Sequence, residues 1–162
     1  MREGRDADVI VVGAGGAGLV AAITAADEGA KVLQLDKMSE LGGTFLISEG
    51  TTSGADTKLQ FEAGIYDDSP YAFYKDCMKE SRAREVCDSG VLMFYCQHSG
   101  EAVDWLDSLG AYTGDERQPI EPIYGEIWEF KRTFWASSAL KYLNVILTKH
   151  EKRVKRGDII EP

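Results

Sequence analysis

Short apolar runs alternate with small-residue and polar stretches over the first part of the chain. Val9–Val12 is a continuous β-branched run, which is typical of a central parallel strand buried on both faces of a sheet. Residues 17–26 are small and mostly apolar and predict a helix, which we expect to end before Gly29. Residues 31–35 predict a second strand. The pattern therefore predicts a β-α-β unit.

The middle of the chain carries signals of helix starts rather than of strands. Ser69, followed by proline, is typical of a helix N-terminus, and Asp88 is a candidate cap for a second helix. We expect Ser99 to cap a third helix that ends near Gly110. Residues 114–125 are rich in glycine and proline and predict an irregular loop. We interpret this region as scaffold.

The last part of the chain returns to a helix followed by a strand. Residues 137–156 predict a helix, and residues 158–161 predict the start of another parallel strand. One stripe of the helix comprises Leu140, Leu143, Leu147, His150 and Val154. We expect His150 to be a structural member of this stripe rather than a catalytic group. Strands that alternate with helices predict an α/β fold with a parallel sheet.

Candidate chemistry begins in the turn between the first strand and the first helix. Gly13 permits a tight turn, Gly15 lets the backbone approach phosphate groups, and Gly18 lets the helix pack closely on the strand. The first N–H groups of that helix remain available to an anion. Asp36 follows the second strand, where a carboxylate accepts hydrogen bonds from ribose hydroxyls and repels the 2′-phosphate of NADP. These features predict a dinucleotide site.

A second glycine-rich segment narrows the choice of dinucleotide. It comprises residues 41–44 and continues through residues 48–54. A nicotinamide-binding domain has no obvious need for this segment, whereas the isoalloxazine ring of FAD needs more backbone around it. The sequence therefore favours FAD over NAD, and a NAD-dependent dehydrogenase domain remains the alternative.

These residues together resemble the FAD-binding part of the fumarate reductase and succinate dehydrogenase flavoprotein superfamily. The resemblance rests on residues 8–22, on Asp36 with Lys37, on residues 42–44 and on residues 68–70, and it extends loosely through residues 103–111. It implies a Rossmann-like FAD-binding domain of the glutathione-reductase type, with residues 1–162 as its N-terminal part. The predicted cofactor-binding residues are Gly13, Ala14, Gly15, Gly16, Ala17, Gly18, Asp36, Lys37, Gly42, Gly43, Thr44, Phe45, Ser48, Glu49 and Gly50.

The same resemblance implies a flavin-dependent oxidoreductase. Hydride would pass between flavin N5 and a small-molecule substrate, an activated alkene or its saturated counterpart. The family's capping domain and C-terminal flavin-binding segment have no counterpart in this sequence. We therefore expect a second polypeptide to supply them, and we expect this chain alone to be inactive. The catalytic acid or base of the family lies in those segments, so no catalytic residue is assigned. A non-catalytic assembly subunit of a flavoprotein complex is a further alternative.

Composition limits the other possibilities. The chain has 162 residues, of which 44% are hydrophobic, and one core of ordinary size is expected. A formal net charge of −9 argues against nucleic acid as a partner. No apolar run approaches the ~20 residues of a membrane span, and the N-terminus does not resemble a signal peptide, which favours a cytoplasmic location.

Two further sets of residues have candidate chemistry. The three cysteines have spacings that match no common metal motif, so we expect buried free thiols and no metal site. The remaining candidates for substrate contact are the loop of residues 114–125 and the aromatic run of residues 126–135, which contains Arg132. An equally weighted alternative is that this run packs against another segment.

Overall fold

The computed structural model describes residues 6–79, 86–121, 128–136 and 138–161. The chain divides into two compact units. The first comprises Met1–Glu49 together with Ser138–Pro162, and the second comprises Gly50–Ser137. The candidate nucleotide turn lies in the first unit.

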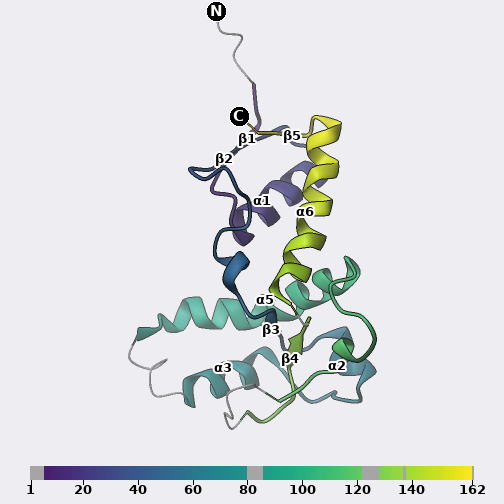
Figure 1. The fold of residues 1–162 in the computed structure, drawn as a ribbon. Helices are drawn as coiled ribbons and strands as arrows, with labels where there is room; N and C mark the ends of the chain where they lie inside the picture. Colours follow the sequence, from purple (N-terminus) through teal and green to yellow (C-terminus); the bar gives the residue numbers. More distant parts are fainter. Residues whose placement is uncertain (1–5, 80–85, 122–127, 137, 162) are drawn as a thin grey trace, which may run out of the picture. The chain divides into compact units, whose positions relative to one another are not determined.

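The first unit is a parallel sheet with two long helices (Figure 1). Its elements are β1 (Val9–Val12), α1 (Gly16–Asp27), β2 (Val32–Leu35), the 3-10 helix η1 (Gly43–Ile47), α6 (Ala139–Arg156) and β5 (Ile159–Ile160). The strand order is β1-β2-β5, and both pairings are parallel. The α/β class, the β-α-β unit and the C-terminal helix and strand are confirmed.

The position expected for the first strand is wrong. Among the described residues β1 pairs only with β2, so it forms an edge, and β2 is the central strand. Ile10 is 61% exposed and Val12 is 82% exposed. A β-branched run reports the preference of a segment for burial, but the order of strands depends on which other segments reach the sheet. The face bearing Ile10 and Val12 is therefore apolar and open.

The two helices pack on the opposite face of this sheet. Both crossovers move along the sheet in the same direction, so right-handed connections place α1 and α6 on one side, where they contact each other. The core beneath them consists of Ala22, Ala26, Val32 and Ile159. In the predicted stripe of α6, Leu143 and His150 are buried, but Leu140 is half exposed. The helix ends at Gly157, whose φ of +82° is the left-handed conformation common after a helix.

The second unit is mainly helical. Its elements are β3 (Thr51–Ser53), α2 (Lys58–Glu62), α3 (Pro70–Lys79), α5 (Ser89–Ser108), the 3-10 helix η2 (Gly114–Arg117) and β4 (Thr133–Trp135). Strands β3 and β4 pair antiparallel. The predicted caps are confirmed, because the Ser69 hydroxyl accepts from Ala72 N and the Asp88 carboxylate accepts from Gly90 N and Val91 N. Within the predicted loop of residues 114–125, residues 114–117 form η2, and residues 122–125 lie outside the described residues.

The expectation of a new helix at Ser99 is wrong, because α5 runs unbroken through it. The Ser99 hydroxyl donates to the Cys96 carbonyl at 2.8 Å and accepts from Ala55 N at 3.2 Å. A serine that bonds back to the preceding turn is compatible with a helix interior. Ser99 therefore joins α5 to the segment after β3 instead of starting a helix.

The expectation of three buried thiols is confirmed only for one cysteine. Cys96 is buried and Cys77 is half-buried, but Cys87 is exposed. Cys87 directly precedes the N-cap of α5, where the helix start faces solvent. Its environment therefore differs from that of the two helical cysteines.

Candidate functional site

The turn after β1 is held close to the start of α1. Gly13 has a φ of +111°, which favours glycine, and its N–H donates to the Leu35 carbonyl at 2.7 Å. A Cβ atom on Gly18 would lie 1.9 Å from the Gly13 carbonyl oxygen. The helix approaches the turn so closely that only glycine fits at position 18.

The N-terminus of α1 is open on the side where an anion would bind. Its N-cap residue is Gly15, so no side chain caps the first N–H groups. Cβ atoms built on Gly13 and Gly15 would meet nothing within 4 Å. Free N–H groups beside open space, at the positive end of a helix dipole, fit a pyrophosphate.

The second glycine segment lies directly against the first. Gly42 N donates to the Ala14 carbonyl at 2.8 Å, and Gly42 pairs with Gly15 in a short parallel bridge. A Cβ atom on Gly43 would lie 3.2 Å from the Gly15 Cα atom. The structure thus brings together the two segments that the sequence assigned to one cofactor.

Asp36 closes the other side of the turn. Its Oδ1 accepts from Met38 N at 2.8 Å, and its Oδ2 accepts from Ala14 N. These backbone hydrogen bonds, that from Met38 most strongly, lower the pKa of Asp36 below its ordinary value. The carboxylate is therefore ionised at neutral pH and is an acceptor for ligand hydroxyl groups.

Two cavities border Asp36 at the carboxyl ends of β1 and β2. One has a volume of about 310 Å³. Its lining residues are Ala14, Gln34, Asp36, Met38, Ser39, Leu41 and Glu161. The other has a volume of about 240 Å³ and is lined by Val12, Gly13, Leu35, Asp36 and Lys37. Ligands of open α/β sheets bind at this end of the strands.

The remaining predicted residues have different surroundings. The Phe45 ring covers Gly16, where an added Cβ would lie 2.0 Å from the ring. Five of the other predicted site residues in the first unit are exposed, namely Ala17, Lys37, Thr44, Ser48 and Glu49. Gly50 belongs to the second unit, where its carbonyl accepts from Ala136 N at 3.0 Å. Within the first unit, the geometry therefore groups the two glycine turns with Asp36.

Gln34, a side chain beside the turn, was missed from the sequence, and so was its contact with His150, for which only a structural place in the stripe of α6 was predicted. Gln34 donates to the Gly13 carbonyl at 3.2 Å, and His150 lies 2.6 Å from Gln34. The sequence did carry a signal for Gln34, because it is the one polar residue in the apolar run of β2 and lies at an alternate position of the strand that faces the helices.

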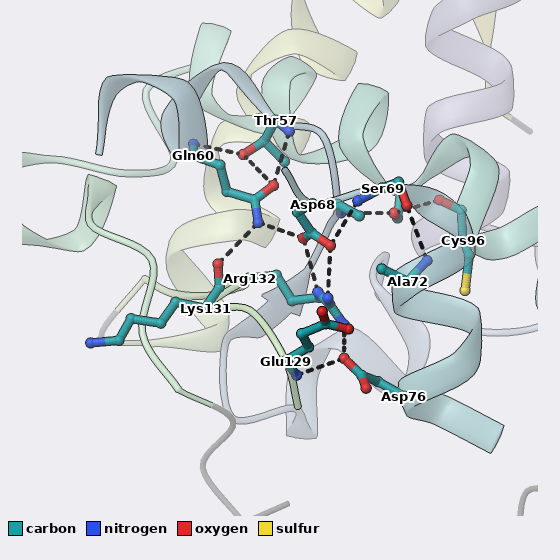
Figure 2. Close-up of polar contacts among 12 residues, drawn as sticks. Thr57, Gln60, Asp68, Ser69, Ala72, Asp76, Cys96, Glu129, Lys131 and Arg132 are labelled. Carbon is teal, nitrogen blue, oxygen red and sulfur yellow. Dashed lines mark hydrogen bonds and ion pairs between the residues drawn. The ribbon is translucent and has the colours of Figure 1, made fainter. Parts of the chain in front are cut away.

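Of the two alternatives for the run that contains Arg132, packing is the one that the structure supports at this residue, because Arg132 is buried in an ion cluster. Figure 2 shows its guanidinium between Asp68 and Asp76. Nε and Nη2 donate to the two oxygens of Asp68 at 3.0 and 2.7 Å, and Nη1 donates to Asp76 at 2.8 Å. The arginine is 0% exposed and also lies over the Phe73 and Trp128 rings. Arg132 therefore holds the second unit together.

The same ion cluster is extended by backbone and amide groups. Burial acts to raise the pKa of Asp76, but hydrogen bonds from Lys79, Glu129 N and Arg132 outweigh it and lower that pKa. Gln60 donates to Asp68 at 2.7 Å and to the Lys131 carbonyl at 3.0 Å. Asp76 is thus ionised, and both Asp68 and Asp76 are paired with Arg132.

A parallel β-α-β unit, a glycine turn at a free helix N-terminus and an ionised acid after the second strand define a dinucleotide-binding domain. A family described as "FAD binding domain" matches residues 8–127, and the chain belongs to this family. Its cofactor is FAD.

Individual relatives agree with this assignment. The chain is 38% identical to the fumarate reductase (cytochrome) of Shewanella frigidimarina over 104 residues, which is 64% of this chain and 18% of the relative. It is 35% identical to the urocanate reductase of Eggerthella lenta over 120 residues, which is 74% of this chain and 19% of the relative. The chain therefore spans about a fifth of the length of these relatives.

Solved structures show the same fold. A flavocytochrome c3 fumarate reductase in an open conformation superposes with a TM-score of 0.64 at 28% identity, over 96% of this chain and 26% of that chain. The 3-ketosteroid-delta4-(5alpha)-dehydrogenase of Rhodococcus jostii RHA1 has a TM-score of 0.67 at 22% identity, over 96% and 37% of the two chains. Within the described ranges, no helix has the length and apolar character needed to cross a membrane.

Proposed function

We propose that this chain is the FAD-binding portion of a flavin-dependent oxidoreductase that acts on an activated alkene or its saturated counterpart. The observation that carries the proposal is the junction of the two glycine segments at the free N-terminus of α1. The named fumarate and urocanate reductases support the substrate class. When bound, FAD supplies a carrier that accepts or donates hydride at N5.

The residues of this chain would bind and orient the cofactor. The first N–H groups of α1 would hold the pyrophosphate, and Asp36 would accept hydrogen bonds from the ribose of the adenosine. The 310 Å³ cavity beside Asp36 combines apolar Met38 and Leu41 with polar Gln34 and Glu161. That lining suits the adenosine end of the cofactor.

We further propose that a second polypeptide segment completes the domain and supplies the catalytic acid or base. The open edge and apolar face of β1 support this, since Ile10 and Val12 are exposed among the described residues. No residue of this chain is assigned to proton transfer. The proposal places the protein in the cytoplasm, as the sequence predicts.

A visible spectrum with intact mass, taken on protein isolated from its native source, tests the proposal. We expect a flavin absorption band and a second polypeptide that co-purifies. Reduction of fumarate or urocanate by this preparation, with a reduced dye as electron donor, would then test the substrate class. A colourless chain that binds a partner without turnover would instead indicate an assembly subunit, and one that binds NAD would indicate a dehydrogenase domain.

Replacement of Asp36 by asparagine should weaken FAD binding by roughly ten- to a hundred-fold, because hydrogen bonds to a charged acceptor are lost. The amide of the Asp36→Asn variant would also place an NH2 donor against the N–H group of Ala14 or of Met38, both of which now donate to the carboxylate. Quenching of flavin fluorescence measures the affinity. Asp27→Asn is the matched control, because Asp27 is an ionised carboxylate at the far end of α1, paired with Arg153 and Lys149. Equal FAD affinities for Asp36→Asn and Asp27→Asn would show that Asp36 does not contact the cofactor.

A further inference from the structure

A buried pair of side chains connects helix α6 to the glycine turn. His150 on α6 is 1% exposed, and Gln34 on β2 is 2% exposed. His150 Nε2 lies 2.6 Å from Gln34 Oε1, and Gln34 Nε2 lies 3.2 Å from the Gly13 carbonyl oxygen. The helix therefore reaches the turn through one amide group.

The chemistry of the acceptor fixes the direction of both hydrogen bonds. The Gly13 carbonyl only accepts, so Gln34 presents its amide nitrogen to the turn and its oxygen to the histidine. His150 must therefore carry a proton on Nε2 and donate it. The other ring nitrogen, Nδ1, faces Glu161 at 3.8 Å.

The ring is neutral at neutral pH. Burial lowers the pKa of His150 below its ordinary 6.5, while Glu161 at the end of β5 and Glu151 on α6 act in the opposite direction. A neutral imidazole with Nε2–H is the tautomer that the hydrogen bond to Gln34 requires.

The peptide group between Gly13 and Ala14 is held from both sides. Its carbonyl oxygen accepts from Gln34, and its N–H, on Ala14, donates to the Asp36 carboxylate. Rotation of this peptide would break both hydrogen bonds at once. The orientation of Asp36 is thereby coupled to Gln34 and, through Gln34, to His150.

We infer that Gln34 and His150 are positioning residues for FAD, which hold the Gly13–Ala14 peptide and the Asp36 carboxylate in the orientation that binds the cofactor. Two polar side chains at core positions carry a desolvation cost that apolar side chains of similar size would avoid, and their hydrogen bonds lead to the turn. A turn fixed before binding loses less conformational entropy when the ligand arrives. This inference rests on the proposed function, because it presupposes that FAD binds at this turn.

The first test is FAD affinity, measured by flavin fluorescence quenching on the full chain freed of cofactor. Gln34→Met and His150→Leu keep the side-chain volume nearly constant and remove the hydrogen bonds, and each should weaken binding roughly three- to ten-fold. His150→Gln should restore binding, because a glutamine amide places a donor near the position of Nε2. Ile146→Val is the control, since Ile146 is buried on the same helix and contributes no polar atom.

The second test asks whether Gln34 and Asp36 act through the same peptide. In a double-mutant cycle of Gln34→Met and Asp36→Asn, the combined loss of FAD affinity should be smaller than the product of the two separate losses. Independent, multiplicative losses would overturn the inference. So would a His150→Leu variant that folds and binds FAD as tightly as the wild type.

A third test uses the unsubstituted chain and so does not depend on whether any variant folds. Nitrogen-15 NMR of His150 at pH 7 should show a neutral ring protonated on Nε2, and a ring whose only proton is on Nδ1 would overturn the inference. Because the folded pKa of His150 is lower than its ordinary 6.5, the wild type should lose stability as pH falls below 6.5, and His150→Gln should lose less over the same range. A wild type that binds no FAD even together with its co-purifying polypeptide would refute the proposed function, whereas wild-type binding with unaffected variants would refute only this inference.

Discussion

Substitution of Arg132 by methionine is expected to destabilise the second unit by about 3–5 kcal/mol, which is the usual cost of breaking a buried ion pair by removing one partner. The guanidinium has 0% exposed side-chain surface, and the side chains of Asp68 and Asp76 are 2% and 0% exposed. Without the arginine, two buried carboxylates remain without their main counter-charge. A loss of this size is a large part of the stability of an ordinary domain.

Urea unfolding of the full chain, followed by tryptophan fluorescence, measures this effect. Arg117→Met is the matched control, because Arg117 also pairs with two carboxylates, those of Glu62 and Asp107, but its side chain is 34% exposed. Exposed ion pairs contribute only about 0–1 kcal/mol, so the control should lose little. Conversion of Asp68 and Asp76 to asparagine in the Arg132→Met background should recover part of the loss. Equal losses for the two arginine variants would contradict a buried role for Arg132.

The aromatic run that contains Arg132 illustrates a limit of prediction from sequence. A cation among aromatic residues is the same pattern whether it contacts a substrate or lies in a core. The distinction depends on Asp68 and Asp76, which are more than fifty positions away from Arg132 along the chain. The cap signals, by contrast, are local. Ser69 and Asp88 each bond to N–H groups two or three residues later, and these were predictable.

The nucleotide turn was also predictable, because its requirements lie within a few residues. The glycine spacing and the strand before it are local, and Asp36 follows from the end of the next strand. The order of strands was not predictable, since it depends on which segments pair with β1 and β2. His150 and Gln34 are 116 positions apart, so no local pattern announces their hydrogen bond. Ser99 was misassigned because a hydroxyl that bonds within a helix resembles a cap in sequence.

Substitution of Gly18 by alanine is expected to weaken FAD binding by on the order of a hundred-fold, the equivalent of one to two lost hydrogen bonds to a charged group. The new methyl carbon would lie 1.9 Å from the Gly13 carbonyl oxygen, which is backbone and has no rotamer to change. Helix α1 would have to move away from the turn, and its first N–H groups would move out of hydrogen-bond reach of a bound pyrophosphate.

The loss expected for Gly18→Ala is opposite in sign to the effect of helix propensity, so the two causes can be told apart. Alanine stabilises a helix interior by about 1 kcal/mol relative to glycine, so a loss of stability and affinity must come from the contact with Gly13. Thr24→Ala, on the exposed face of the same helix, should bind FAD as the wild type does. Fluorescence quenching and thermal unfolding measure both quantities for the two variants.

Gly16→Ala separates a backbone obstacle from a side-chain obstacle in the same helix. The three atoms nearest to its added Cβ would all belong to the Phe45 ring, the closest at 2.0 Å, and a side chain can change its rotamer. We therefore expect an intermediate loss of FAD affinity for Gly16→Ala. In a chain that already carries Phe45→Ala, adding Gly16→Ala should cost less FAD affinity than it does in the wild type. No second substitution should rescue Gly18→Ala, because the obstacle there is the main chain of the turn. Wild-type affinity in Gly18→Ala would show that FAD does not use the N-terminus of α1.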